Sequence, residues 1–177
     1  MKKYIITGIF ILFSAVGVLA QRFAYVDSEY ILKHIPEYTS SQKQLDALSQ
    51  QWQKEVDTRF ADIEKLYKTY QADQVLLTAV MRKRREDEIV EKERDAKEFQ
   101  RIKFGYEGEM FQQRTRLVKP IQDRVAKAIQ SVAESQSLDM VFDKNSEIML
   151  LYASPRLDKS NDVITRLGYK PNASSKQ

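Results

Sequence analysis

The sequence predicts a mainly α-helical fold with a small β part, in which a long antiparallel helical hairpin projects from a small, oligomerising base of short strands. Three observations predict it. After the first twenty residues, glycine occurs only at Gly105, Gly108 and Gly168, and 31% of the chain is charged. Apolar residues recur at helical spacing over residues 45–70, and short β-prone runs stand near both ends. So few turn formers favour long helices over a compact mixed fold.

The first twenty residues have the pattern of a secretory signal. Met1-Lys2-Lys3 is a positive start, and a predominantly apolar run follows from Tyr4 to Leu19. Val18-Leu19-Ala20 places small residues at the −3 and −1 positions, so we expect export and cleavage after Ala20. Gln21 ends the run before the length of about 20 residues that a membrane-spanning helix needs, although retention as an anchor is the alternative.

The composition of residues 21–177 excludes several classes. No cysteine is present, so an exported chain must gain its stability from packing or assembly instead of disulfides. Because Lys2 and Lys3 leave with the signal, 27 basic residues face 25 acidic ones, and uniform nucleic-acid binding is not expected.

The first part of the base is expected at residues 21–38. Phe23–Val26 is a short strand candidate, and Asp27-Ser28 is suited to cap a brief helix over Glu29–Ile35 that Pro36 ends. The arm follows at residues 39–118, with Thr39 as the expected N-cap and Gln42 completing a capping box.

The outgoing helix of the arm is predicted over 39–72. Its apolar positions are on average about 3.6 residues apart, which places them on one face, and the helix would be about 51 Å long at ~1.5 Å per residue. The tip is expected at about 72–80, where Thr78 caps a return helix that runs to about Val118. Folding the chain back at the tip brings Trp52 and Phe99 together between the helices.

The second part of the base is expected at residues 119–168, followed by a flexible tail at 169–177. A helix runs from Pro120 to about Ser135, Leu138–Phe142 and Ile148–Tyr152 form a β-hairpin, and Ser160 or Asn161 caps a last short helix. Three short strands do not protect their own edges, so we expect pairing with other copies of the chain. The expected oligomerisation residues are Phe23, Tyr25, Val26, Leu138, Val141, Phe142, Leu150 and Tyr152.

The tip is the candidate binding region. It combines apolar residues with a basic run, a combination that attracts acidic, partly unfolded chains and offers them an apolar surface. A solvated helix face is the plainer interpretation of the charges. The candidate client-binding residues are Val75, Leu76, Leu77, Val80, Met81, Arg82, Lys83, Arg84 and Arg85.

Gly105 and Gly108 fall inside the expected return helix, where each costs about 1 kcal/mol relative to alanine. They are interpreted either as small residues at a tight helix contact or as a hinge, in which case alanine at both positions should stiffen the arm.

No feature of the sequence favours catalysis. His34 is the only histidine, and no nucleophile motif or phosphate-binding loop is present. The acidic residues of 86–93 lack the convergent spacing of a metal site. We therefore expect no enzymatic activity, no cofactor and no metal.

Both ends of the chain carry motifs of a known family. Phe23-Ala24-Tyr25-Val26-Asp27-Ser28 and Ile35-Pro36-Glu37 resemble the opening of the Skp (OmpH-like) periplasmic chaperones. The closing half is similar at Pro120-Ile121, Ala128-Ile129, Val132-Ala133, the run Leu138 to Asp143, Asn161-Asp162-Val163-Ile164 and Leu167. The resemblance covers almost all of the chain after the signal, and its specificity lies in the order of short motifs around a long charged hairpin.

The resemblance implies a homotrimer whose strands form a small central barrel and whose three arms enclose a cavity. It also implies a periplasmic holdase that binds unfolded outer-membrane proteins without ATP. The basic run Arg82–Arg85 fits the cationic arms of that family, whereas the nearly neutral total charge fits them less well. The alternatives are a structural or adaptor coiled coil of the cell envelope, and a protein that contacts the membrane surface through the tip.

Overall fold

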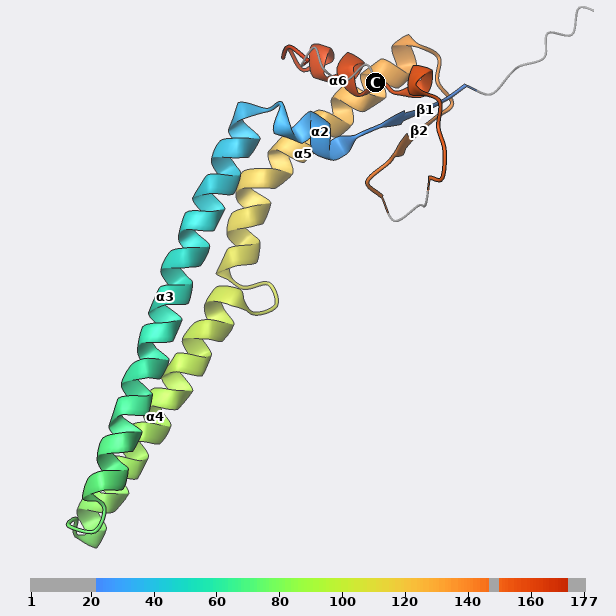
Figure 1. Cartoon of the computed structure of the whole chain (residues 1–177). Helices are drawn as coiled ribbons and strands as arrows, with labels where there is room; N and C mark the ends of the chain where they lie inside the picture. Colours follow the sequence, from blue (N-terminus) through green and yellow to red (C-terminus); the bar gives the residue numbers. More distant parts are fainter. Residues whose placement is uncertain (1–21, 147–149, 172–177) are drawn as a thin grey trace, which may run out of the picture. The chain divides into compact units, whose positions relative to one another are not determined.

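A computed structural model describes residues 22–146 and 150–171, which form two compact units. The helical unit is Tyr30–Lys127, and the terminal unit comprises the described residues of Met1–Glu29 and Ala128–Gln177. The fold is mainly helical with one small sheet (Figure 1). In chain order the elements are β1 (Phe23–Val26), α2 (Ser28–Lys33), α3 (Pro36–Asp73), α4 (Ala79–Phe104), α5 (Glu109–Ser135), β2 (Met140–Asp143), the 3₁₀ helix η1 (Pro155–Leu157) and α6 (Ser160–Arg166).

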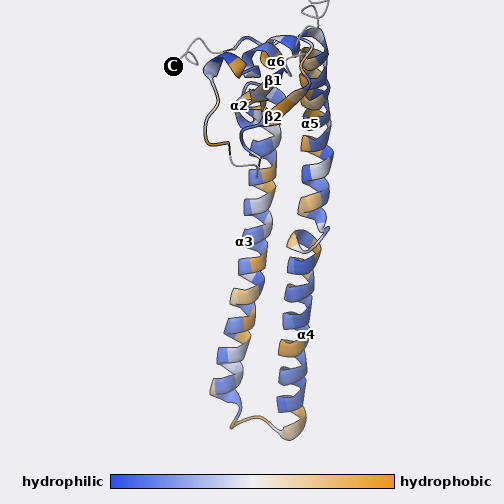
Figure 2. Cartoon of the chain, turned by 90° about the vertical axis from the view of Figure 1, so that its right-hand side faces the viewer, coloured by the Kyte–Doolittle hydropathy of each residue, from blue (hydrophilic) through white to orange (hydrophobic). Residues whose placement is uncertain are grey.

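The helical unit is built around the antiparallel pair α3 and α4, which lie side by side in both cartoon views (Figures 1 and 2). The 38 residues of α3 span about 57 Å, and its buried side chains are Leu45, Trp52, Val56 and Ile63. Their spacing of four or seven residues, which is one or two helical turns, places them on one face. The predicted outgoing helix is therefore confirmed.

The start of α3 corrects one detail of the prediction. The helix begins at Pro36, three residues before the expected Thr39, and its N-cap is Ile35 with no side-chain cap. Proline suits the first turn because its missing N–H has no partner there in any helix. The predicted capping box is wrong, since Gln42 lies inside the helix and donates to the Tyr38 hydroxyl at 2.8 Å.

The turn between α3 and α4 covers residues 74–78 and agrees with the predicted tip. The Thr78 hydroxyl accepts a hydrogen bond from the Met81 N–H at 3.3 Å, which confirms the predicted cap of the second helix. The Arg82 guanidinium donates to the Gln74 carbonyl at 3.1 Å and closes the turn.

The return path of the chain differs from the single helix that was predicted. α4 ends at Phe104, and α5 begins at Glu109. We call the four residues between them the 105–108 loop. α5 continues through Pro120 to Ser135. Within the helical unit Arg124 of α5 forms an ion pair with Glu37 of α3 at 3.4 Å.

The terminal unit contains a two-stranded parallel sheet. β1 pairs with β2 in the register Phe23↔Met140 to Val26↔Asp143. The predicted β-hairpin is wrong as far as the structure describes it, because Leu150–Tyr152 form no strand; Ile148 and Met149 lie outside the described residues. The first run of the predicted hairpin, Leu138–Phe142, contributes β2, which pairs with β1 instead of with the second run.

A network of polar side chains joins β1 to the segments after β2 and before α6. The Ser160 hydroxyl accepts from the Asp27 N–H at 2.8 Å and donates to Asp158 at 2.6 Å. Asp27 also accepts from the Asn145 amide and pairs with Lys144, both at 2.7 Å. Ser160 is only 2% exposed, so it is the buried centre of this network. It begins α6 but does not cap the helix as predicted, because the N-cap position belongs to Lys159.

The pKa values of two side chains in the terminal unit are shifted, Lys144 of this network and Tyr25 of β1. The hydrogen bond to Asp27 raises the pKa of the Lys144 ammonium, and burial together with the nearby Asp158 raises the pKa of the Tyr25 hydroxyl. In both cases the folded protein favours the protonated form.

Replacing Ser160 with alanine should destabilise the terminal unit by about 1–3 kcal/mol, because the Asp27 N–H loses its acceptor in a partly buried site. The check is the urea midpoint followed by circular dichroism. Ser146→Ala is the control, since that hydroxyl is exposed and bonds only locally, to the Asp143 carbonyl. Equal effects of the two substitutions would contradict the prediction.

The raised pKa values of Lys144 and Tyr25 predict alkaline sensitivity. Their contribution to the free energy of unfolding is complete below a pH of about 10 and is lost as the pH rises through the folded-state values. Urea midpoints measured from pH 8 to 11 should show this loss. It should be smaller in Lys144→Met than in Lys127→Met, which changes an exposed lysine of α5.

Candidate functional site

The candidate client-binding residues gather at the turn between α3 and α4. We call the nine residues the tip patch: Val75, Leu76, Leu77, Val80, Met81, Arg82, Lys83, Arg84 and Arg85. Val75 and Val80 are each 80% exposed, Leu76 is 82% exposed and Met81 52%. Figure 2 shows this hydrophobic turn between two predominantly hydrophilic helices. These four apolar side chains are therefore presented to solvent, whereas Leu77 is partly buried.

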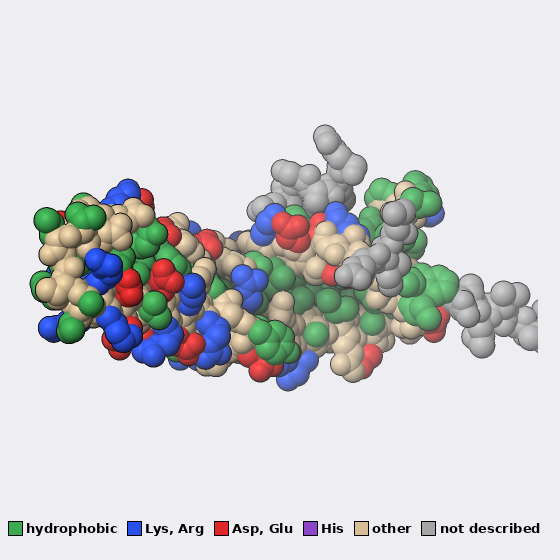
Figure 3. Space-filling view, turned by 90° about the horizontal axis from the view of Figure 1, so that it is seen from below, with side chains coloured by type: hydrophobic (Ala, Val, Ile, Leu, Met, Phe, Trp, Pro, Cys, Tyr) green, Lys and Arg blue, Asp and Glu red, His purple; other side chains and the backbone are tan. Residues whose placement is uncertain are grey.

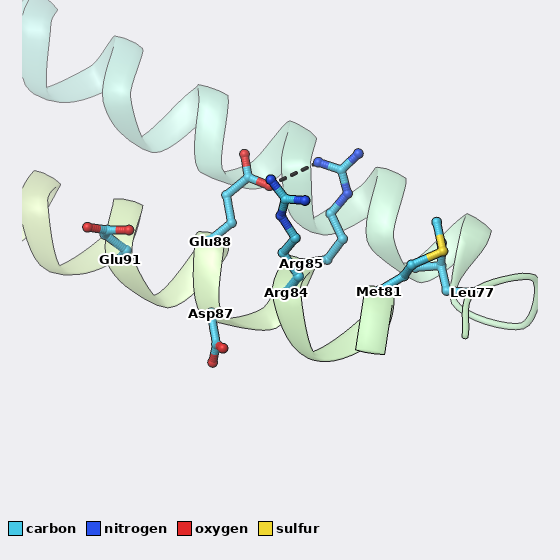
Figure 4. A pocket seen from close by; sticks show the side chains of 7 residues that line it. All are labelled: Leu77, Met81, Arg84, Arg85, Asp87, Glu88 and Glu91. Carbon is cyan, nitrogen blue, oxygen red and sulfur yellow. Dashed lines mark hydrogen bonds and ion pairs between the residues drawn. The ribbon is translucent and has the colours of Figure 1, made fainter. Parts of the chain in front are cut away.

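The surface beside the turn shows how apolar and charged groups alternate there. In the view from below, hydrophobic side chains protrude at the end of the hairpin with Lys and Arg side chains next to them (Figure 3). An open hollow lies along α4, with Leu77 and Met81 at the turn end, Arg84, Arg85 and Glu88 in the middle and Glu91 at the other end (Figure 4). A bound segment would meet apolar groups first and ionic groups further along.

Basic and acidic residues at the start of α4 are separated along the helix, and their charges cancel over residues 82–91. Four basic residues at 82–85 precede four acidic ones at 86–88 and 91. Lys83 pairs with Asp87 at 3.3 Å and Arg85 with Glu88 at 2.9 Å. Because these pairs are exposed, each adds little to stability, and the basic groups remain available to exchange partners.

The two predicted hinge residues bound the break between α4 and α5. They lie in a loop and not inside a helix as predicted, whereas the expected effect of alanine on arm stiffness stays a prediction. A Cβ on Gly105 would lie 2.3 Å from the Arg101 carbonyl oxygen, and one on Gly108 would lie 2.8 Å from the Ile102 carbonyl oxygen. Between them Glu107 has a φ of 51°. The loop needs both glycines because backbone oxygens occupy the space of a side chain.

The aromatic residues of the hairpin lie next to the 105–108 loop. Trp52 is 8% exposed and contacts the Phe104 ring edge-on, with ring centroids 6.2 Å apart. Phe99 is partly buried and carries the Arg59 guanidinium over its ring at 4.2 Å. Both predicted aromatic residues thus pack between α3 and α4, but Arg59 and Lys103 belong to the same cluster and were not predicted. Charged side chains on a helix usually face solvent, so the sequence alone does not indicate this packing.

The expected oligomerisation residues differ in exposure in the terminal unit. Phe23 is 40%, Leu150 42% and Tyr152 83% exposed, whereas Val26 is 2% exposed and packs inside the unit. Tyr25, Leu138, Val141 and Phe142 are partly buried. Met140 and Leu151, at 56% and 88%, are exposed apolar side chains that were not predicted. The described part of this unit therefore presents an open apolar surface beside its two strands.

The part of the chain that the structure describes contains no group of His, Asp and Glu side chains arranged to hold a metal ion. His34 contacts the Tyr30 ring at a centroid distance of 4.3 Å, and its Nδ1 lies 2.8 Å from the Tyr30 carbonyl oxygen. Across residues 22–146 and 150–171, none of the helices has the length and apolar character needed to span a membrane.

Gly105→Ala should lower the stability of the helical unit by about 1 kcal/mol or more, because the loop must rearrange to admit the methyl group. Thermal unfolding followed by circular dichroism measures this. Tyr106→Ala is the matched control in the same loop: its side chain is 96% exposed, so a change within about 0.5 kcal/mol is expected. A Gly105→Ala variant as stable as the parent would contradict the close contact with Arg101.

Comparisons with known proteins agree with this fold. The model of the family "Outer membrane protein (OmpH-like)" matches residues 22–167. A crystal structure from Caulobacter crescentus CB15, provisionally described as an outer membrane chaperone (OmpH-like), is similar with a TM-score of 0.64. The two share 13% identity, and the match covers 85% of this chain and 86% of that one, so it supports the fold. The comparison with curated proteins gave no match.

The family match extends over more than half of the chain and includes the strands, the hairpin and α6. This confirms the resemblance that the terminal motifs indicated. OmpH-like proteins are non-enzymatic chaperones of the periplasm. The chain belongs to the OmpH-like (Skp) family of outer membrane chaperones.

Proposed function

We propose that this chain is an ATP-independent periplasmic holdase, which binds unfolded outer-membrane proteins between helical arms and prevents their aggregation. The observation that carries the proposal is the tip patch. Three of its apolar side chains, Val75, Leu76 and Val80, are about four-fifths exposed and stand beside four basic residues. Exposed apolar surface of this kind is unfavourable in a protein that has no partner for it.

The chemistry of the tip patch suits an unfolded client. Each apolar side chain offers a small contact, worth at most about 1.5–3 kcal/mol when fully buried. The neighbouring arginines and lysine make charge-assisted contacts that exchange easily with water and with the acids of 86–91. Many weak contacts of both kinds hold an extended chain without fixing one conformation, and they permit release without a fuel.

Self-association completes the proposal. Phe23, Leu150 and Tyr152 expose apolar surface next to a sheet of only two strands. Such a sheet is marginal alone, and pairing with other copies would cover both its edges and these side chains. A homotrimer would then present three arms to one client. Export by cleavage after Ala20 belongs to the proposal too; residues 1–21 lie outside the described part.

The exposed tip also favours this function over a structural or adaptor coiled coil. An adaptor that docks on a folded partner would be expected to have a fully packed helical pair, whereas here several apolar side chains at the far end of the pair face solvent. Contact of the tip with a membrane surface remains an alternative use of the same residues. Vesicles in place of an unfolded client test it directly.

The purified protein should suppress the aggregation of an unfolded β-barrel protein at about one trimer per client, as measured by light scattering after dilution from urea. Size-exclusion chromatography with light scattering gives the molar mass in the same preparation. An absence of suppression at several-fold excess would rule out the holdase function, whatever the oligomeric state.

Replacing Val75, Leu76 and Val80 together with serine should weaken client binding about tenfold or more, because three exposed apolar contacts of about 0.5 kcal/mol each are lost. The matched control is the triple serine replacement of Val90, Ile102 and Phe111, which are exposed at 66%, 42% and 55% elsewhere on α4 and α5. Fluorescence anisotropy of a labelled client measures both. Equal weakening would place the binding surface outside the tip patch.

A further inference from the structure

The 105–108 loop has a defined conformation held by its own hydrogen bonds. The Gly105 N–H donates to the Arg101 carbonyl at 2.8 Å, and the Gly108 N–H donates to the Gly105 carbonyl at 2.9 Å. The Gln112 side chain donates to the Glu107 carbonyl at 3.2 Å. The loop is therefore a specific interruption between two helices and not a frayed end.

The other helix of the pair passes this interruption without a break. α3 runs from Pro36 to Asp73, and its Trp52 contacts Phe104, the last residue of α4. Beside the 105–108 loop, α3 is therefore continuous, whereas the return path is interrupted between α4 and α5. Movement at the loop requires no change in the hydrogen bonds of α3.

A single side chain contacts all three helices at this level. The Lys103 ammonium forms an ion pair with Glu109 of α5 at 2.5 Å. It also lies 4.8 Å from the ring centroid of Trp52 on α3 and 5.5 Å from that of Phe99 on α4. Its side chain is 18% exposed, so these contacts are made largely away from water, where cation–π and ionic interactions are stronger.

Beyond Lys103, α4 also contacts α3 through the Tyr70 hydroxyl, which donates to Glu86, and through Arg59, which lies over the Phe99 ring. Its ion pairs stay within the helix, and most connect residues three or four positions apart: Lys83–Asp87, Arg85–Glu88, Glu91–Arg94, Glu93–Lys97 and Glu98–Arg101. The buried side chains that it contributes to packing are Ile89 and Ala96, which meet Ile63 of α3. Ion pairs within one helix stabilise that helix but do not hold it against its neighbour. α4 can therefore remain helical when its contacts with α3 are broken.

We propose that α4 separates from α3 as one rigid helix about the 105–108 loop, and that Lys103 restrains this opening by holding the three helices together. Opening breaks the contacts of Lys103 with Trp52 and Glu109 at the same time. It uncovers the apolar face of α3 at Ile63, Leu66 and Tyr70, which α4 covers when the pair is closed. The hairpin therefore has a second, hidden apolar surface in addition to the tip patch.

The absence of cysteine from the chain makes this opening measurable. Ala96→Cys places a thiol at a position that is 1% exposed and faces α3, so a thiol reagent reacts only when α4 opens. In this background Lys103→Met, which keeps the length of the side chain and removes the charge, should raise the labelling rate about tenfold. That factor corresponds to a loss of about 1.4 kcal/mol. The measurement uses the full chain without client, so its outcome is independent of the holdase proposal.

Two controls separate opening from general instability. Lys83→Met removes an exposed α4 lysine that pairs only within its helix, and the labelling rate should stay unchanged. Leu45→Cys, at a position 3% exposed near the root of α3, should stay protected when Lys103 is replaced. Glu109→Gln, a milder change, should give a smaller increase at position 96. An unchanged rate at position 96, or an equal rise at positions 45 and 96, would overturn the proposal.

Discussion

The parallel pairing of β1 with β2 is the constraint on which the rest of the chain depends. Parallel strands cannot be joined by a tight turn, and here the connection is residues 27–139, which is 113 residues and contains α2 to α5. The helical hairpin is thus a greatly extended crossover between two four-residue strands. The register is supported by polar contacts at the strand ends, above all the buried Ser160 between Asp27 and Asp158.

The two helices of the hairpin use different means to remain helical. α3 contributes most of the buried face, with Leu45, Trp52, Val56 and Ile63. α4 contributes the buried Ile89 and Ala96 and the partly buried Phe99 and Phe104, and it carries ion pairs along its own surface. Each exposed pair stabilises the helix by only about 0.2–0.5 kcal/mol. Because the pairs lie within α4, they support its helical conformation and add nothing to its packing against α3. This asymmetry explains why an interruption is tolerated on the return path while the outgoing helix remains continuous.

Much of the helical architecture could be predicted from the sequence, because the spacing of apolar residues and the Thr78 cap are local signals. The position of Pro36 was also readable, but it was interpreted as the end of one helix, although proline is equally suited to begin the next. The β-hairpin was predicted wrongly because Leu138–Phe142 and Ile148–Tyr152 are both apolar runs next to a polar loop, which favours their pairing with each other. The actual partner of the first run is β1, and this long-range pairing leaves no local signal in the sequence. The cluster around Lys103 was missed for a similar reason: nothing local shows that a lysine will lie over an aromatic ring of another helix.

Trp52 is the chain's only tryptophan, and its place in the helical pair has a spectroscopic consequence. Its indole lies edge-on to Phe104 and under the ammonium group of Lys103, at 4.8 Å from the ring centroid. A nearby ammonium group and a change of solvent access both alter indole emission. All ultraviolet fluorescence excited at the red edge of the absorption band therefore originates at the level where the return helix is interrupted. The protein carries its own optical reporter there, without a dye or a substitution.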